Sequence, residues 1–300
     1  MILHRLEKDG LINPPKFLVE GTQYLCAMGS TAYGVAGEKS DLDCYGWTYP
    51  DKAVIFPHTA GHVRGYGENP PNFESYQEHH VKSKEGKEYD FQIYSVVKFF
   101  DLLRINTPNA TDALFVPDRC VLFASDIGKH VRENRRVFLH KGAYHKFRGY
   151  AYSQLQKTAN KKKADNDDRQ ADIDAFGYDV KSGYHVVRLA LQCQQILEEG
   201  DLQLDRNAEL LKAIRRGEWT LDRLKEWFAE KEIHLERAYS ETKLPAIPDE
   251  AAIKALLLNV LEAHYGSLSA VVQKENDISR LVKALDTVIA PYRSYGRGDA

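Results

Sequence analysis

Two aspartates of the chain stand where carboxylates could share a metal ion. Asp41 and Asp43 are separated by one residue, and an apolar stretch follows them. If residues 41–47 form a β-strand, its period of two places both carboxylates on one face, about 7 Å apart. Carboxylates so close need a neutralising cation, and divalent metal ions favour oxygen ligands. The alternative is a polar turn, because Lys39 and Ser40 also suit a loop.

A third aspartate lies in a later apolar segment. Asp90 stands between Tyr89 and Phe91 within residues 88–94, a stretch that is typical of a β-strand. We expect its carboxylate beside the other two aspartates, with Mg²⁺ or Mn²⁺ as the neutralising partner. Three acids can hold the two metal ions of nucleotidyl transfer, and Asp90 would lie closest to the attacking hydroxyl. The alternative for Asp90 is a surface strand residue that pairs with a lysine.

A glycine and a serine precede these acids. Apolar residues 24–28 lead into Gly29 and Ser30, and ten residues separate Ser30 from Asp41. Gly29 would let the backbone approach a triphosphate, and Ser30 with nearby N–H groups would bond its oxygens. Ser30 could instead cap a helix without touching a substrate.

Three basic residues follow one stripe of a predicted helix in the second half of the chain. Lys181, His185 and Arg188 are spaced four and three residues apart, so they share a helix face. Such a stripe could bind a triphosphate or an acceptor phosphate, with Arg188 strongest through bidentate contacts. The alternative is a solvated face with structural ion pairs.

The composition limits the classes of protein that the chain can belong to. The formal net charge is -2, so nucleic-acid binding would need a local basic patch. The four cysteines form no C-x-x-C pair and favour reduced thiols over a disulfide framework. No stretch approaches the roughly 18 apolar residues of a membrane span, and the N-terminus has no apolar signal core. We therefore expect a cytoplasmic protein without a membrane partner.

The pattern of apolar residues predicts an α+β fold. Residues 15–120 are mixed: short apolar runs at 17–20 and 24–28 indicate strands, residues 60–88 a long loop with room for a hairpin, and residues 95–103 a helix. From about residue 125 the pattern turns helical. Its four longest periodic stretches are residues 143–158, 182–197, 221–239 and 248–265. A charged loop is expected at residues 160–169.

Three features of the chain together resemble the signature of the DNA polymerase beta-type nucleotidyltransferase superfamily. They are a strand that leads into Gly29-Ser30, the Asp41-x-Asp43 motif, and Asp90 between apolar residues. Within it, GSTAYG…SDLDCYGW looks most like the RNA-ligase-associated nucleotidyltransferases. The resemblance extends into residues 147–157 and 181–189 and covers roughly residues 20–200.

This resemblance implies a small mixed sheet backed by helices, Mg²⁺, and an NTP donor, and it suggests an RNA or tRNA acceptor. The expected domains are a catalytic domain at 1–135, an α-helical domain that completes the substrate cleft at 136–290, and a flexible tail at 291–300. Two other hypotheses stay open at this point. The same acids could transfer a nucleotide to a protein or small molecule, or the chain could be a non-catalytic relative that only binds a nucleotide.

Overall fold

The computed structural model describes residues 1–37, 40–160, 167–271 and 285. These residues form two compact units, which we describe separately. The larger unit consists of Met1–Tyr49 and Glu74–Leu257, and the smaller one of Pro50–Phe73 and the described residues from Leu258 onward. The predicted boundary at residue 135 falls inside the larger unit and stays a prediction. The predicted tail and most of the predicted loop at 160–169 lie outside the described residues.

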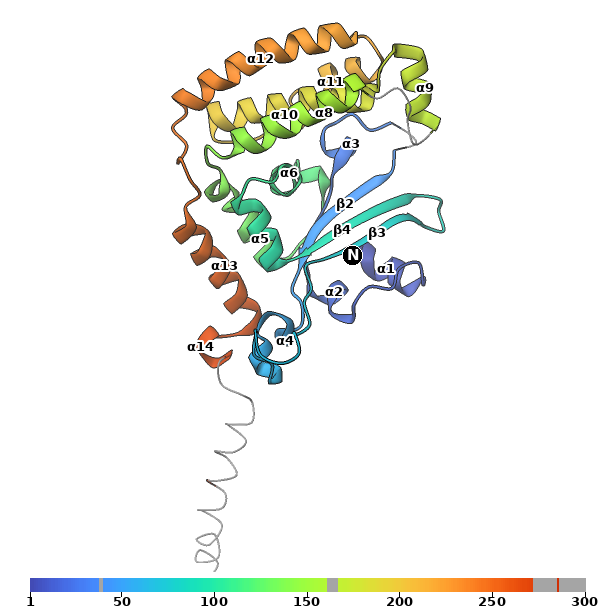
Figure 1. Ribbon diagram of the computed structural model, residues 1–300. Helices are drawn as coiled ribbons and strands as arrows, with labels where there is room; N and C mark the ends of the chain where they lie inside the picture. The colour runs from blue at the N-terminus through green and yellow to red at the C-terminus, as the bar shows by residue number, and fades with distance from the viewer. Residues whose placement is uncertain (38–39, 161–166, 272–284, 286–300) are drawn as a thin grey trace, which may run out of the picture. The chain divides into compact units, whose positions relative to one another are not determined.

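The larger unit contains a five-stranded mixed sheet with the strand order β3-β4-β2-β1-β5 (Figure 1). β2 is antiparallel to β1 and parallel to β4, while β3 and β5 pair antiparallel with β4 and β1. The strands are β1 (Thr22–Ala27), β2 (Leu42–Thr48), β3 (Ser75–Lys82), β4 (Glu88–Ser95) and β5 (Val121–Ala124). A mixed sheet followed by helices confirms the predicted α+β class.

Two of these strands carry two of the predicted acids, Asp43 on β2 and Asp90 on β4. β4 alternates strictly between buried and partly exposed residues, so it packs one face on the core and turns the other outward. β2 is buried at every position except Asp43. The strand predictions at 24–28, 41–47 and 88–94 are therefore confirmed to within a few residues. Within the loop predicted at residues 60–88, residues 75–82 form β3, and the hairpin there consists of β3 and the following strand β4.

One strand prediction is wrong. Residues 17–20 belong to a helix, α2 (Lys16–Gly21), which begins directly after Pro15 and ends where β1 starts. Leu18 and Val19 are buried there, and the Thr22 hydroxyl donates a hydrogen bond to the Leu18 carbonyl. A run of three apolar residues followed by Glu20 does not distinguish a strand from a buried helical turn, and here the preceding proline favours the helix.

Short helices flank the sheet. They are α1 (Ile2–Lys8), α3 (Gly29–Ala32), α5 (Val96–Arg104), α6 (Pro108–Phe115) and α7 (Asp126–Glu133). The predicted helix at 95–103 is confirmed, and the Ser95 hydroxyl caps it by accepting a hydrogen bond from the Lys98 N–H. α6 begins with Pro108, where the missing N–H has no helical partner to lose.

The second half of the larger unit is helical (Figure 1). It contains α8 (Ala143–Asn160), α9 (Asp167–Phe176), α10 (Val180–Glu199), α11 (Ala208–Arg215) and α12 (Leu221–Glu241). α10 is central and packs against the other four. Its apolar face, which includes Val186, Val187, Leu189 and Ala190, is buried. The predicted helices at 143–158, 182–197 and 221–239 are confirmed.

α13 (Glu250–Tyr265) confirms the helix predicted at 248–265. Its last residues belong to the smaller unit, together with the short helices α4 (Lys52–Ile55) and α14 (Leu268–Val271). Within this unit the Tyr265 ring packs edge-on against Phe56, and its hydroxyl donates a hydrogen bond to the Pro50 carbonyl.

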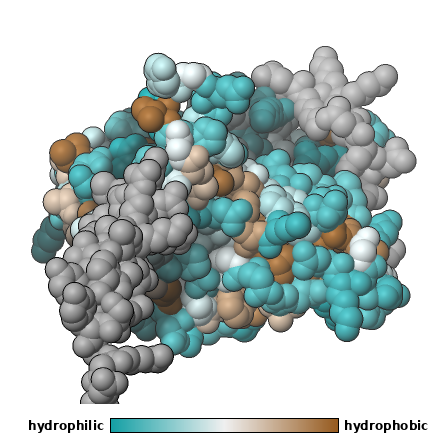
Figure 2. All heavy atoms as spheres, turned by 90° about the horizontal axis from the view of Figure 1, so that it is seen from below, coloured by the Kyte–Doolittle hydropathy of each residue, from teal (hydrophilic) through white to brown (hydrophobic). Residues whose placement is uncertain are grey.

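The polarity of the surface, the state of the cysteines and the character of the helices can each be compared with the composition of the chain. On the face shown in Figure 2, hydrophilic residues predominate, and apolar ones are scattered among them. All four cysteines are buried free thiols, as expected. Among the described helices, none combines the length and the apolar character that a membrane span requires.

Candidate active site

Asp43 and Asp90 are brought together by the parallel pairing of β2 with β4. The two residues are direct partners in the register of these strands. Directly opposite residues of neighbouring strands point to the same face of a sheet, so both carboxylates lie on one side. Asp41 precedes β2, and its charge also acts on Asp43. The structure therefore gathers the three predicted acids in one region, and their catalytic and metal-binding roles stay predictions.

The surroundings of Asp43 disfavour the charged form of its carboxyl. Partial burial raises the pKa of the Asp43 carboxyl above its ordinary value, and the negative charge of Asp90 raises it further. Lys181 lowers this pKa through its positive charge, whereas Asp41 adds to the rise. Among the described residues no cation lies within ion-pair distance of Asp43. Like charges in this arrangement favour the binding of a cation.

Gly29 makes room for one of these acids. A Cβ atom at this position would lie 1.8 Å from the Asp43 Oδ2 atom, and the backbone there has φ +59°, which favours glycine. The Met28 N–H also donates a hydrogen bond to the Asp43 carbonyl. The sequence suggests a glycine here for approach to a triphosphate, and the structure adds a second reason, the space that Asp43 occupies. Ser30 follows in the first turn of α3 and is half-buried.

Asp90 has two further neighbours that sequence reasoning missed. The His80 N–H donates a hydrogen bond of 2.7 Å to Asp90 Oδ1, and His79 Nδ1 lies 3.7 Å from Asp90 Oδ2. His79 also lowers the pKa of Asp43 through its charge. Two adjacent histidines in a strand were the available signal, but only the pairing of β3 with β4 shows which acid they face.

Two of the three predicted basic residues of α10 are accessible. Lys181 is exposed, near the first turn of the helix, and His185 is half-buried with its ring 4.2 Å from that of Tyr184. Burial lowers the pKa of His185 well below its ordinary value, and the nearby charges of Arg188 and Lys181 lower it further. His185 is therefore uncharged near neutral pH, and the exposed positive charge at the end of α10 that acts on Asp43 is that of Lys181. This suits an anionic ligand.

Arg188, the third residue of the stripe, is buried. Its Nη1 atom donates hydrogen bonds to the Tyr33 hydroxyl at 2.5 Å and to Asp112 Oδ2 at 2.7 Å, and its guanidinium lies over the Tyr33 ring. Only 4% of its side chain is exposed, and that of Asp112 is fully buried. Arg188 thus links α10 to α6 and to the turn after α3. Its predicted contact with a nucleotide stays a prediction, and its position favours a supporting role.

The residues fit a divalent cation in kind. Three carboxylates are the ligands that Mg²⁺ and Mn²⁺ prefer, and the pKa of Asp43 is raised first by its partial burial and then by the negative charge of Asp90. As the side chains lie, no set of three His, Cys, Asp or Glu residues in the described part of the chain is arranged closely enough to hold a metal ion. A metal site here would need the acid side chains to turn toward one another.

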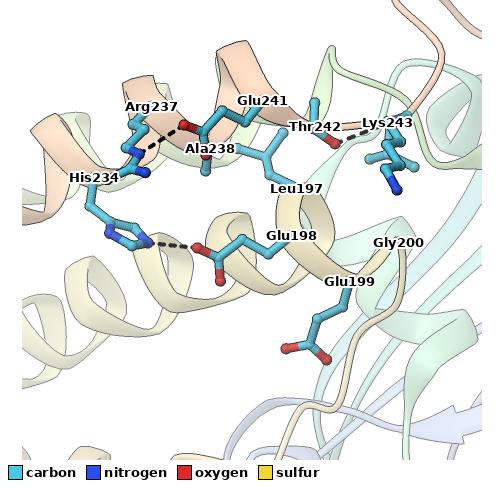
Figure 3. A pocket seen from close by; sticks show the side chains of 11 residues that line it. Leu197, Glu198, Glu199, Gly200, His234, Arg237, Ala238, Glu241, Thr242 and Lys243 are labelled. Atoms are coloured by element: carbon cyan, nitrogen blue, oxygen red, sulfur yellow. Dashed lines mark hydrogen bonds and ion pairs between the residues drawn. The ribbon is translucent and has the colours of Figure 1, made fainter.

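A pocket lies at the opposite end of α10 (Figure 3). Its volume is about 600 Å³, and it is lined by the ends of α10 and α12. Four of its charged groups pair with each other: His234 with Glu198 at 2.6 Å, and Arg237 with Glu241 at 2.8 Å. Residues 181 and 199 of one helix are about 27 Å apart. This pocket is therefore separate from the three acids.

A mixed sheet with acids on adjacent strands, next to a basic helix end, is the organisation of a nucleotidyltransferase-like protein. A family profile described as RlaP, the RNA repair pathway DNA polymerase beta family, matches residues 19–277. The chain belongs to this family. The match includes the three acids and the whole of α10.

Other comparisons are less informative. The structure is similar to a nucleotidyltransferase-like protein from Exiguobacterium sibiricum, with 12% identity over 98% of this chain and 90% of that one. The TM-score of 0.29 is too low to transfer a residue or an activity from that protein. No curated protein matches the chain.

Proposed function

We propose that the protein is a metal-dependent nucleotidyltransferase that moves a nucleoside monophosphate from an NTP to a hydroxyl on an RNA or tRNA end. The observation that carries this proposal is the parallel register that sets Asp43 beside Asp90, with Asp41 and Gly29 next to Asp43. Membership of an RNA repair family supports the choice of RNA as acceptor.

In this proposal the acids hold the metal. Asp41, Asp43 and Asp90 would bind Mg²⁺ or Mn²⁺, which when bound neutralises charge on the phosphate oxygens. The backbone N–H groups at Gly29 and Ser30 would donate hydrogen bonds to the triphosphate. This assignment uses the close approach that a residue without a side chain permits.

The basic end of α10 has a role in binding the donor. Lys181, whose charge already acts on Asp43, would bind a phosphate oxygen of the NTP, with His185 beside it. Arg188 would support the site indirectly. It donates a hydrogen bond to the hydroxyl of Tyr33, which directly follows α3, and thereby helps to fix the backbone at Gly29 and Ser30.

The bond changes follow from this placement. The acceptor hydroxyl oxygen forms a bond to the α-phosphorus of the NTP, the bond from that phosphorus to the bridging oxygen breaks, and pyrophosphate leaves. The hydroxyl proton passes to Asp90. Its Oδ2 atom is the better acceptor, because Oδ1 already accepts the His80 N–H.

Incubation with Mg²⁺ or Mn²⁺, each α-³²P-labelled NTP and total RNA tests the proposal. The control is the Asp41→Ala/Asp43→Ala protein, and a matched control removes two acids at the far end of α10 (Glu198→Gln/Glu199→Gln). We expect label on RNA with the wild type and the matched control only. Label on the protein itself would indicate a protein acceptor. Saturable NTP binding without transfer would indicate a non-catalytic relative.

A further inference from the structure

β3 contains a bulge opposite Asp90. The strand pairs Glu78 with Phe91 and Val81 with Tyr89, so His79 and His80 together face the single residue Asp90. The extra residue changes the phase of the strand. Val81 thereby reaches the buried face, whereas uninterrupted alternation from Glu78 would have turned it the other way. Bulges of this kind redirect side chains and occur often beside active sites.

The backbone of His80 adopts a left-handed conformation, with φ 57°. Among the described residues, Asn106 is the one other non-glycine with positive φ, and it closes α5 with side-chain hydrogen bonds to the Leu103 and Phe138 carbonyls. His80 closes no helix. Its conformation instead directs its N–H at Asp90 Oδ1, and its ring is tied to Glu88 at 2.6 Å.

Asp90 is consequently held from two sides. On β2 its neighbour is Asp43, a like charge, and on β3 its neighbours are the His80 N–H and the His79 ring. A hydrogen bond from a backbone N–H to a carboxylate is a strong, directional contact. With one oxygen fixed, the other keeps a defined direction.

We propose that the His79–His80 bulge is a positioning device for Asp90, in which the left-handed backbone of His80 aims its N–H at Oδ1 and leaves Oδ2 for the metal and the acceptor hydroxyl. This inference rests on the proposed function. His80 acts through Asp90, and it is the backbone conformation, not the imidazole, that matters.

Substitutions that differ in their tolerance of positive φ separate these two contributions. His80→Gly and His80→Asn remove the imidazole but accept the left-handed region, whereas His80→Val removes it and disfavours that region. Gln77→Val, on the exposed part of the same strand, is the matched control for a valine in β3. The readouts on the full chain are Mn²⁺ affinity by electron paramagnetic resonance, thermal unfolding, and kcat and KM.

The expected order of Mn²⁺ affinity is clear. The His80→Gly, His80→Asn and Gln77→Val proteins should bind Mn²⁺ about as tightly as the wild type. His80→Val should bind Mn²⁺ about 10-fold more weakly, because loss of a hydrogen bond that orients a metal ligand lowers metal affinity by that factor or more. The transferase defect of His80→Val should fall on kcat more than on KM. If the valine protein does not fold, His80→Ala should show an intermediate loss.

Three outcomes would overturn the positioning role. The first is an equal loss of Mn²⁺ affinity in all His80 variants, which would assign the effect to the imidazole. The second is an unchanged Mn²⁺ affinity in His80→Val or His80→Ala. The third is a wild-type protein that does not bind Mn²⁺. A wild type that binds Mn²⁺ with the expected variant order but transfers no nucleotide would instead defeat the proposed function and leave the positioning role supported.

Discussion

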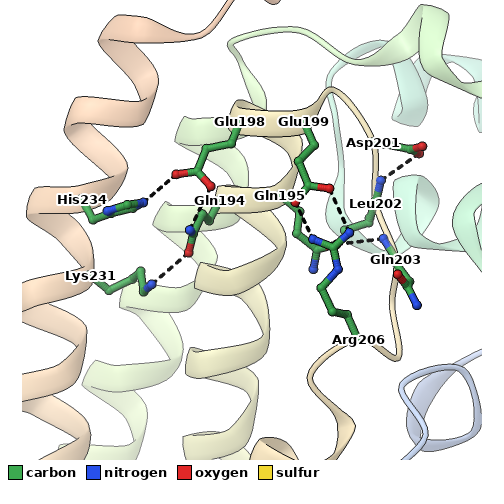
Figure 4. Close-up of polar contacts among 10 residues, drawn as sticks. All are labelled: Gln194, Gln195, Glu198, Glu199, Asp201, Leu202, Gln203, Arg206, Lys231 and His234. Atoms are coloured by element: carbon green, nitrogen blue, oxygen red, sulfur yellow. Dashed lines mark hydrogen bonds and ion pairs between the residues drawn. The ribbon is translucent and has the colours of Figure 1, made fainter.

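The polar and charged residues at the two ends of α10 differ in whether they have a partner. At the C-terminal end, Glu198 pairs with His234, Glu199 with Arg206, and Gln194 with Lys231 (Figure 4). At the N-terminal end, no acid among the described residues lies within ion-pair distance of Lys181, and its charge acts on Asp43, which itself lacks a close cation.

This difference separates charges that are paired within the fold from charges that, in the proposed function, would bind metal and triphosphate. Exposed pairs such as Glu198–His234 contribute about 0–1 kcal/mol each and leave nothing uncompensated. At the other end, partial burial of Asp43 and the negative charge of Asp90 together raise the pKa of the Asp43 carboxyl. Uncompensated charge beside an ordered glycine turn is what a binding site for metal and triphosphate requires.

The largest effect is expected from the acids. Asp43→Asn should lower kcat at least about 1,000-fold, because several kcal/mol of charge stabilisation through the metal would be lost. The comparison variant, Glu198→Gln, should retain the wild-type rate. Steady-state kinetics with labelled NTP measures both, and an active Asp43→Asn protein would remove Asp43 from the mechanism.

The buried link behind the site should control stability. Arg188→Ala should lower the free energy of unfolding by about 3–5 kcal/mol, because Asp112 would remain buried without its partner. Arg188→Met/Asp112→Leu should recover much of this loss, since it removes both charges. Urea denaturation checks both variants. If Arg188→Ala keeps full stability and only raises KM, Arg188 binds the nucleotide directly.

The raised pKa of Asp43 predicts a pH dependence of stability. The folded protein binds this proton more tightly than the unfolded chain, so the group favours folding below its unfolded pKa, and that contribution is lost as pH rises through the folded pKa. Without metal, the Tm of Asp43→Asn should therefore rise relative to that of the wild type as pH increases from the unfolded pKa of Asp43 to its folded pKa. Mg²⁺ should raise the Tm of the wild type more than that of the variant. A difference that does not change with pH would contradict this electrostatic account.

The smallest effect is expected at the paired end of α10. His234→Gln should change the free energy of unfolding by less than about 1 kcal/mol, because its pair with Glu198 is exposed. Transfer activity should not change. Thermal unfolding and the labelled-NTP assay measure the two quantities. A loss of activity here would extend the functional region to the pocket at this end and weaken the contrast between the two ends.

Much of the local structure could be predicted from the sequence. Alternating and apolar runs located β1, β2 and β4, the 3.6-residue periodicity located α8, α10 and α12, and Ser95 marked the start of α5. Such features depend on neighbours within a few residues, which is why the pattern reveals them. The shared face predicted for Asp41 and Asp43 stays a prediction, because β2 begins at Leu42. The run at 17–20 was too short for its period to distinguish a helix from a strand.

Contacts between distant segments had no such local signal. The partner of Arg188 is Asp112, 76 residues away on α6, so a helical stripe could not show that the third cation is buried. The bulge opposite Asp90 arises where β3 meets β4, and the space that Gly29 leaves for Asp43 arises where α3 meets β2. The sequence by itself determines which kinds of residue are present in the site. The tertiary structure decides which of their charges have a partner, because only long-range packing sets the neighbours of each side chain.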